Sequence, residues 1–108
     1  MAYCHQNNVV HRDLKPENII LETIGKDILV KLIDFGTSVK FDLGEKFTKP
    51  FGSVYYIAPE VINGNYDAAC DLWSCGVILY IILTGQPPFS GKDDDKIIKA
   101  IRSNKLDF

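Results

Sequence analysis

One segment, Asp67 to Thr84, restricts the fold more than any other, because its apolar residues leave almost no polar face. Its large apolar side chains are Leu72, Trp73, Val77, Ile78, Leu79, Ile81, Ile82 and Leu83. Gly85, Pro87 and Pro88 follow as stop signals, so we predict a helix over residues 67–84. A helix that is apolar all round belongs at the centre of a larger body. A chain of 108 residues cannot easily surround it, so we expect an exposed apolar patch and self-association of the isolated chain.

The remaining pattern predicts short elements in an α+β fold that is mainly helical. Residues 1–6 are typical of the end of a helix. Two β-branched and aliphatic runs, 19–21 and 28–33, flank a turn at 22–27 and predict a β-hairpin. Residues 34–64 lose periodicity and gather Gly and Pro, which predicts a long structured loop of the kind that carries function.

A second, amphipathic helix is predicted towards the end of the chain. Ser90 and Asp93 have the spacing of a capping box, and isoleucines follow at helical spacing. The run from Asp93 to Asp95 does not fit an EF-hand calcium loop, because Ile98 occupies the position that needs Gly. These acids instead complement the dipole of the helix.

Composition excludes several classes of function. The chain has 12 Lys and Arg against 14 Asp and Glu, so it lacks the positive charge that nucleic-acid binding needs. Its longest apolar run, Val77 to Leu83, is far shorter than the roughly 20 residues that cross a bilayer. Cys4, Cys70 and Cys75 are odd in number and lack metal-ligand spacing, which favours reduced core thiols over zinc ligands or disulfides. We therefore expect a cytoplasmic protein without nucleic-acid partners or a membrane span.

Three motifs carry the chemistry of the chain. Residues 11–18 read His-Arg-Asp-Leu-Lys-Pro-Glu-Asn, residues 34–36 read Asp-Phe-Gly, and residues 58–60 read Ala-Pro-Glu. In this order they resemble the H-R-D-x-x-x-x-N, D-F-G and A-P-E signatures of eukaryotic protein kinases. Residues 3–11 and 55–61 carry a finer likeness to the calcium-dependent protein kinases of protists and plants.

The resemblance implies that residues 1–108 are a partial protein kinase domain from the C-terminal lobe. The small hairpin would then carry the catalytic and metal-binding loops. A G-x-G-x-x-G loop and a V-A-I-K lysine are missing, so we expect the N-terminal lobe and the end of the C-terminal lobe to lie outside this sequence. That lobe and a C-terminal regulatory region of the parent would be partners of the chain, which we expect to be inactive alone.

Phosphoryl transfer depends on positioning and on neutralising charge, so it needs metal-binding oxygens near the attacking hydroxyl. By resemblance, Asp13 accepts the proton of the substrate hydroxyl, while Asn18 and Asp34 bind Mg²⁺. Lys15 is expected beside the transferred phosphate of ATP, and Ser53 is expected to bridge Asp13 and Lys15 through its hydroxyl. The residues expected to bind ATP with its Mg²⁺ are Lys15, Glu17, Asn18, Ile20 and Asp34.

The resemblance also implies structural roles within the motifs. His11 and Phe35 should stack in an internal spine, so we assign His11 no acid–base role, and Gly36 completes the D-F-G motif. Asp71 is expected to accept backbone N–H groups of the catalytic loop.

Regulation is implied by Arg12, because an arginine beside Asp13 can pair with an anion in the following loop and order that loop. Thr48 is the candidate phosphorylation site in this loop. Glu60 resembles an acid that pairs with a later arginine of kinase chains, and that arginine is missing, since only Arg12 and Arg102 occur.

These features predict part of a serine/threonine protein kinase that transfers the γ-phosphoryl group of ATP to a protein Ser or Thr hydroxyl, with calcium regulation in the intact parent. One alternative is a catalytically inactive interaction or regulatory module, against which the intact Asp13, Asn18 and Asp34 argue. Another is a phosphotransferase for small molecules, against which Arg12 and the long loop ending at Glu60 argue.

Overall fold

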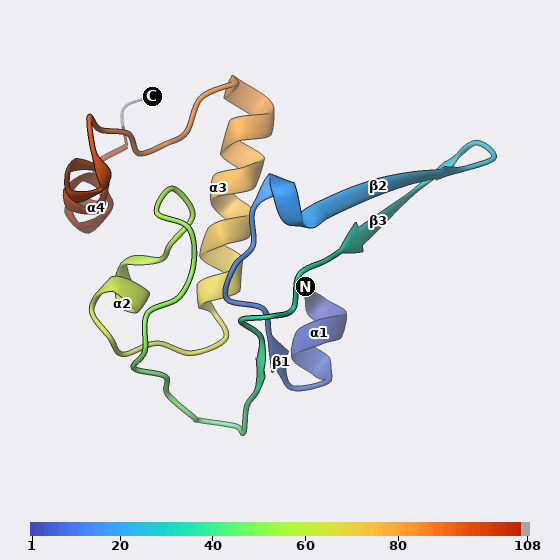
Figure 1. Cartoon of the computed structure of the whole chain (residues 1–108), viewed down its shortest axis with the longest axis horizontal. Coiled ribbons are helices and arrows are strands. Elements are labelled where there is room, and N and C mark those ends of the chain that lie inside the picture. Colours follow the sequence, from blue (N-terminus) through green and yellow to red (C-terminus); the bar gives the residue numbers. More distant parts are fainter. Residues whose placement is uncertain (107–108) are drawn as a thin grey trace.

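The computed structural model of the chain describes residues 1–106. Its helices are α1 (Ala2–Gln6), the single-turn 3₁₀ helix η1 (Pro16–Asn18), α2 (Pro59–Ile62), α3 (Cys70–Thr84) and α4 (Asp94–Ser103). Its strands are β1 (Val9–Val10), β2 (Ile19–Ile24), β3 (Asp27–Leu32) and β4 (Val39–Lys40). Helices and two small antiparallel sheets make up the fold, with α3 in the middle and the β2–β3 hairpin projecting to one side (Figure 1).

The hairpin forms from β-branched and aliphatic runs, as predicted. β2 and β3 pair from Ile19↔Leu32 to Ile24↔Asp27. The turn predicted over residues 22–27 is too long, because the strands continue to a two-residue turn in which Gly25 has φ +62°. Two-residue hairpin turns need this positive φ, which glycine adopts without steric cost.

Helix α3 begins and ends at local signals. Gly85 ends it in the left-handed region, with φ 76°, and donates its N–H to the carbonyl of Ile81. The helix begins at Cys70 and not at Asp67, so the predicted start is wrong. The Asp67 side chain accepts the N–H of Ala69 at 2.9 Å, and this turn occupies the residues before the first helical position.

The chain leaves one side of α3 open to solvent, which confirms the predicted apolar patch. Four aliphatic side chains on it are between 56% and 75% exposed: Leu72, Leu79, Ile82 and Leu83. Val77 and Ile78 of the same helix are buried. No helix within residues 1–106 combines the length and hydrophobicity needed to span a bilayer.

Two buried clusters pack on the covered side of α3. One consists of Val10, Ala58, Val61, Tyr66 and Cys70, and the other of Phe89, Ile97 and Ile101. Trp73 packs against both clusters and stacks on Phe89 with ring centroids 5.7 Å apart. Ile57 also packs against both, so the two halves of the core meet at these two side chains.

Residues 34–64 are mostly loop, as predicted, but they contain pairings that the sequence pattern does not indicate. β1 pairs with β4 through Val9↔Lys40 and Val10↔Val39, and Phe47 bridges to Tyr66. Val10 is fully buried. These pairings attach the loop to the core, because Val39 and Phe47 pack against the cluster that contains Val10 and Tyr66.

Helix α4 has the predicted amphipathic pattern, but the predicted capping box at Ser90 is wrong. Asp93 is the N-cap, and its side chain accepts the N–H of Lys96 at 2.9 Å. A carboxylate at this position satisfies an unpaired N–H and also complements the helix dipole, which a hydroxyl does only in part.

Candidate active site

One buried carboxylate accepts hydrogen bonds from the backbone of His11 and Arg12, the two residues before Asp13. Asp71, in the first turn of α3 and 1% exposed, accepts the N–H of His11 and the N–H of Arg12, each at 2.9 Å. His5 Nε2 lies 2.8 Å from the same carboxylate. Arg12 has φ 71°, a left-handed conformation that costs a non-glycine residue roughly 1–2 kcal/mol. The hydrogen bonds to Asp71 stabilise this conformation of Arg12. They therefore fix the position of Asp13, the next residue in the chain.

His11 is fully buried and uses both ring nitrogens. Nδ1 accepts the N–H of Asp13 at 3.2 Å, and Nε2 lies 3.0 Å from the carbonyl of Ile33. A neutral ring with its proton on Nε2 satisfies both contacts. The ring of Phe35 meets that of His11 edge-on, with centroids 4.9 Å apart, so the predicted contact exists but is not a parallel stack.

Asp13, Lys15 and Ser53 form one hydrogen-bonded group. Lys15 Nζ donates to Ser53 Oγ at 3.0 Å, and the Ser53 hydroxyl donates to Asp13 Oδ1 at 3.1 Å. Lys15 Nζ also lies 3.6 Å from Asp13 Oδ2. Ser53 comes from the loop 40 residues further along the chain, and it lies between the other two side chains as the sequence led us to expect.

Asn18 connects Asp13 to the strand that leads into Asp34. Its side-chain nitrogen donates to the carbonyl of Asp13 at 2.9 Å, and its own carbonyl accepts the N–H of Ile33 at 2.9 Å. Asp34, the residue after Ile33, has a left-handed backbone with φ 58°, and its Oδ1 accepts the N–H of Gly36 at 3.3 Å. The backbone contacts thus bring the two loops that carry Asp13, Asn18 and Asp34 to the base of one hairpin.

Asn18 and Asp34 offer oxygen ligands of the kind that Mg²⁺ binds together with water and substrate phosphates. Within residues 1–106, no group of three or more His, Cys, Asp and Glu side chains is arranged to hold a metal. Mg²⁺ commonly binds one or two carboxylates together with water and substrate phosphates. Asn18 donates through its nitrogen, so its side-chain oxygen is the atom suited to a cation.

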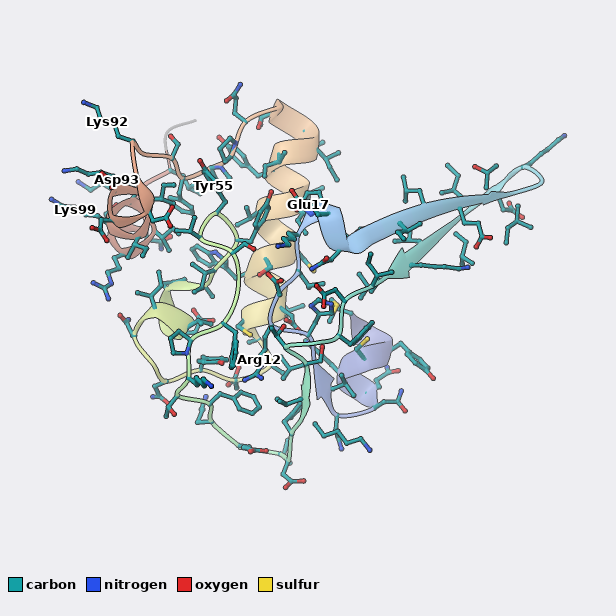
Figure 2. All side chains as sticks on the ribbon, viewed as in Figure 1. Arg12, Glu17, Tyr55, Lys92, Asp93 and Lys99 are labelled. Carbon is teal, nitrogen blue, oxygen red and sulfur yellow. The ribbon has the colours of Figure 1, made fainter. Side chains whose placement is uncertain are left out.

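Two further residues predicted to bind ATP are exposed: Glu17 lies in η1, just before the hairpin (Figure 2), and Ile20 lies on β2. Burial raises the pKa of the Tyr56 phenol above its ordinary value, and the negative charge of Glu17 raises it further. Glu17 therefore acts electrostatically on the loop segment that follows Ser53.

Arg12 lies near the amino-terminal end of α3 (Figure 2), and its guanidinium is enclosed by groups of the loop. Nε donates to the carbonyl of Thr37 at 2.6 Å, and a second nitrogen lies 3.4 Å from the hydroxyl of Tyr66. The group also lies over the rings of Phe51 and Phe47, at 4.3 and 5.6 Å from their centroids. Cation–π contacts of this kind stabilise a cation without a carboxylate or phosphate.

Close backbone approach explains Gly52 in the same loop. Its φ is +118°, and a Cβ there would lie 3.0 Å from the carbonyl oxygen of Arg12. Thr48 is exposed, four residues before this contact. Glu60 forms no ion pair in the part of the chain that the structure describes.

Sequence reasoning missed His5 and Thr37 as parts of the site. His5 reaches Asp71 across 66 residues, and the Thr37 hydroxyl donates to the carbonyl of His11 at 3.1 Å. Neither contact has a local signal, because each depends on how separate segments pack.

Comparison with known proteins agrees with this geometry. The family model for the protein kinase domain matches residues 1–107. Over its whole length the chain is 54% identical to calcium-dependent protein kinase 4 of Plasmodium berghei (strain Anka) and to the protein of that name in Plasmodium falciparum (isolate 3D7). Over 97% of its length it is 52% identical to calcium-dependent protein kinase 21 of Oryza sativa subsp. japonica.

The chain spans only about a fifth of these relatives, 21% of each Plasmodium protein and 19% of the rice protein. The match nevertheless covers all three motifs and almost every residue of the chain. This chain therefore belongs to the protein kinase family and is similar to its calcium-dependent members.

Proposed function

We propose that this chain is the part of a C-terminal kinase lobe that holds the catalytic base and the metal ligands. In the whole protein it would transfer the γ-phosphoryl group of ATP to a serine or threonine hydroxyl of a protein. The observation that carries this proposal is the group formed by Asp13, Ser53 and Lys15, in which two hydrogen bonds link the base, a hydroxyl and a cation. An inactive interaction module would not need this group.

In the proposed reaction Asp13 is the base. Ser53 occupies Oδ1, so Oδ2 is the oxygen that receives the proton of the substrate hydroxyl. Lys15 lies within 3.6 Å of Oδ2 and would neutralise charge on the transferred phosphoryl group as it approaches the substrate oxygen. Ser53 keeps the carboxylate and the ammonium in this relative position.

Asn18 and Asp34 are the residues proposed to hold Mg²⁺, which would neutralise the charge of the ATP phosphates when bound. Asn18 is 5% exposed and hydrogen-bonded to the backbone of Asp13, so it is rigid before any ligand arrives. Asp34 is exposed at the open side of the site. Ile20, 46% exposed on β2, is proposed to lie under the adenine.

Arg12 and Thr48 are proposed to couple phosphorylation to the order of the loop. Arg12 lies over the ring of Phe47, the neighbour of Thr48, so a phosphate on Thr48 would be close to the guanidinium. Mass spectrometry of the active protein tests this step, and an unmodified Thr48 would contradict it. Calcium regulation is proposed for the whole protein only.

A chimera tests the proposed function directly. The matched segment of calcium-dependent protein kinase 4 of Plasmodium falciparum is replaced by residues 1–108, and transfer of labelled phosphate from ATP to a protein substrate is measured. We expect an active chimera and no activity from the 108-residue chain alone. A folded chimera that binds ATP but transfers no phosphate would favour the inactive module.

A further inference from the structure

The β2–β3 hairpin presents an exposed edge and an exposed apolar face. It projects from the rest of the molecule (Figure 1), and within residues 1–106 neither strand pairs with a strand outside the hairpin. Ile28 is 67% exposed and Val30 is 60% exposed. Their cross-strand neighbours on the same face are Thr23 and Leu21. An isolated two-stranded hairpin is only marginally stable in water, so a further strand would stabilise it.

The hydrogen-bond pattern of the hairpin shows which groups of β3 are free to pair. In a two-residue hairpin the pair next to the turn is hydrogen-bonded, and hydrogen-bonded pairs then alternate. The Ile24↔Asp27 pair is therefore bonded, and so is the pair of Asn18 with Ile33, whose N–H donates to the Asn18 carbonyl at 2.9 Å. By this alternation the backbone N–H and C=O groups of Ile28 and Val30 point away from β2, towards the open edge.

We propose that β3 pairs antiparallel with β3 of a second copy, in a register centred on Leu29. In this register Ile28 faces Val30 of the second copy, and these two residues both have free backbone groups. Asp27 then faces Lys31 of the second copy, and Lys31 faces Asp27, so the dimer contains two ion pairs. Shifting the register by two residues in either direction places both charges opposite uncharged residues, and shifting it by four places Asp27 opposite Asp27 or Lys31 opposite Lys31.

The charges on β3 therefore specify a second copy as the occupant. Lys31 already pairs with Glu22 of its own chain, so in the dimer it lies between two carboxylates. Opposite charges directly across an antiparallel pair are favourable, and like charges there are unfavourable. The apolar residues Ile28 and Val30 of the two copies form one continuous face, because two antiparallel strands in one sheet keep the same side.

The same argument predicts a closed dimer and not a fibre. The open edge of β2 carries only one charge, Glu22. If β2 pairs with β2 of another copy in a register centred on Glu22, two carboxylates face each other. If that register is shifted by two residues, Glu22 faces an uncharged residue, so no register of β2 with itself forms an ion pair. The pairing of β3 with β3 is isologous, so it uses each β3 edge once and ends there.

Charge exchange tests the register in the 108-residue chain by analytical ultracentrifugation. We expect a dimer for the natural sequence. In a dimer of Lys31→Asp, aspartates face each other at two places, and in a dimer of Asp27→Lys, lysines face each other at the same two places. Each variant should therefore raise the dissociation constant of the dimer by roughly tenfold or more. An equimolar mixture of the two variants restores opposite charges across the strand pair and should form a heterodimer with an affinity close to that of the natural dimer.

Lys26→Asp is the matched control, because it makes the same charge change at the turn, outside the Asp27–Lys31 register, and should leave the dissociation constant within about threefold. Asp27→Lys keeps the Glu22–Lys31 pair of the hairpin, so it reports on dimerisation even where Lys31→Asp weakens the hairpin itself. A monomeric natural chain, a dimer that persists in both single variants, or a mixture that fails to associate would each overturn the proposal.

Discussion

The carboxylate of Asp71 accepts the backbone N–H of Arg12 at 2.9 Å, and it does so at the residue whose φ of 71° is unfavourable for an arginine. The same carboxylate binds the N–H of His11 and lies 2.8 Å from Nε2 of His5. One buried acid thus connects α1, the loop that carries Asp13, and α3. The geometry of Asp13 depends on this connection, because Asp13 directly follows the strained residue.

Replacing Asp71 by Asn should destabilise the chain. The amide offers one acceptor oxygen, and its NH₂ group meets an N–H donor, so a buried hydrogen bond is lost and a repulsive contact is gained. We expect a loss of about 2–4 kcal/mol in the free energy of unfolding. Urea unfolding measures it, with Asp67→Asn as the matched control at a half-exposed site. Equal losses in the two variants would contradict the role assigned to Asp71.

Replacing Asp13 by Asn in the active chimera should lower kcat by about 10²–10⁴-fold, because a positioned base contributes this much. Binding of ATP should change little, since Asp13 is not among the proposed metal ligands. Steady-state kinetics with varied ATP separate the two effects. Asp42→Asn, at an exposed position of the loop, is the control and should leave kcat unchanged. Unchanged turnover in Asp13→Asn would remove Asp13 from the mechanism.

Ser53→Ala in the same chimera should lower kcat by up to about 30-fold, because it removes two hydrogen bonds of about 1 kcal/mol each and every 1.4 kcal/mol is about tenfold in rate. The change removes the hydroxyl that connects Lys15 with Asp13. Ser53→Thr keeps the hydroxyl and should recover most of the activity. If alanine and threonine have the same effect, the hydroxyl is not the important part of the side chain.

Burial and the neighbouring acid Asp71 raise the pKa of the Cys70 thiol to about 12. The thiolate is the reactive form, so at pH 8 Cys70 should react with iodoacetamide at least roughly 10²-fold more slowly in the folded chain than in urea. Above about pH 9 the unfolded chain releases this proton while the folded chain keeps it, so stability should decrease as the pH rises. Mass spectrometry of the labelled peptide follows the reaction, and equal rates in the two states would contradict the burial of Cys70.

Local signals in the sequence predicted the elements that depend on local physics. Gly85 ends α3 because a left-handed residue is needed there, and the hairpin forms because its strands are rich in β-branched residues. The start of α3 and the cap of α4 were wrong by three residues each. At both places an aspartate side chain, Asp67 or Asp93, competes for nearby N–H groups and decides the boundary.

Contacts between distant segments could not be predicted from residue patterns alone. The pairing of β1 with β4 involves two residues on each strand, too few to produce a detectable alternation. The contact of His5 with Asp71 arises only after α1 and α3 pack together. The bridge through Ser53 was expected because the motifs resemble those of kinases; spacing alone would not indicate that a loop serine lies between Asp13 and Lys15.

Trp73, the sole tryptophan of the chain, touches both buried clusters and stacks on Phe89. Its indole emission therefore responds to loosening of either cluster, since each forms part of the environment of the same fluorophore. A shift towards longer wavelength that coincides with the loss of far-ultraviolet ellipticity would mean that the two halves unfold together. An earlier shift would reveal a state in which the helical content survives after the aromatic junction has admitted water.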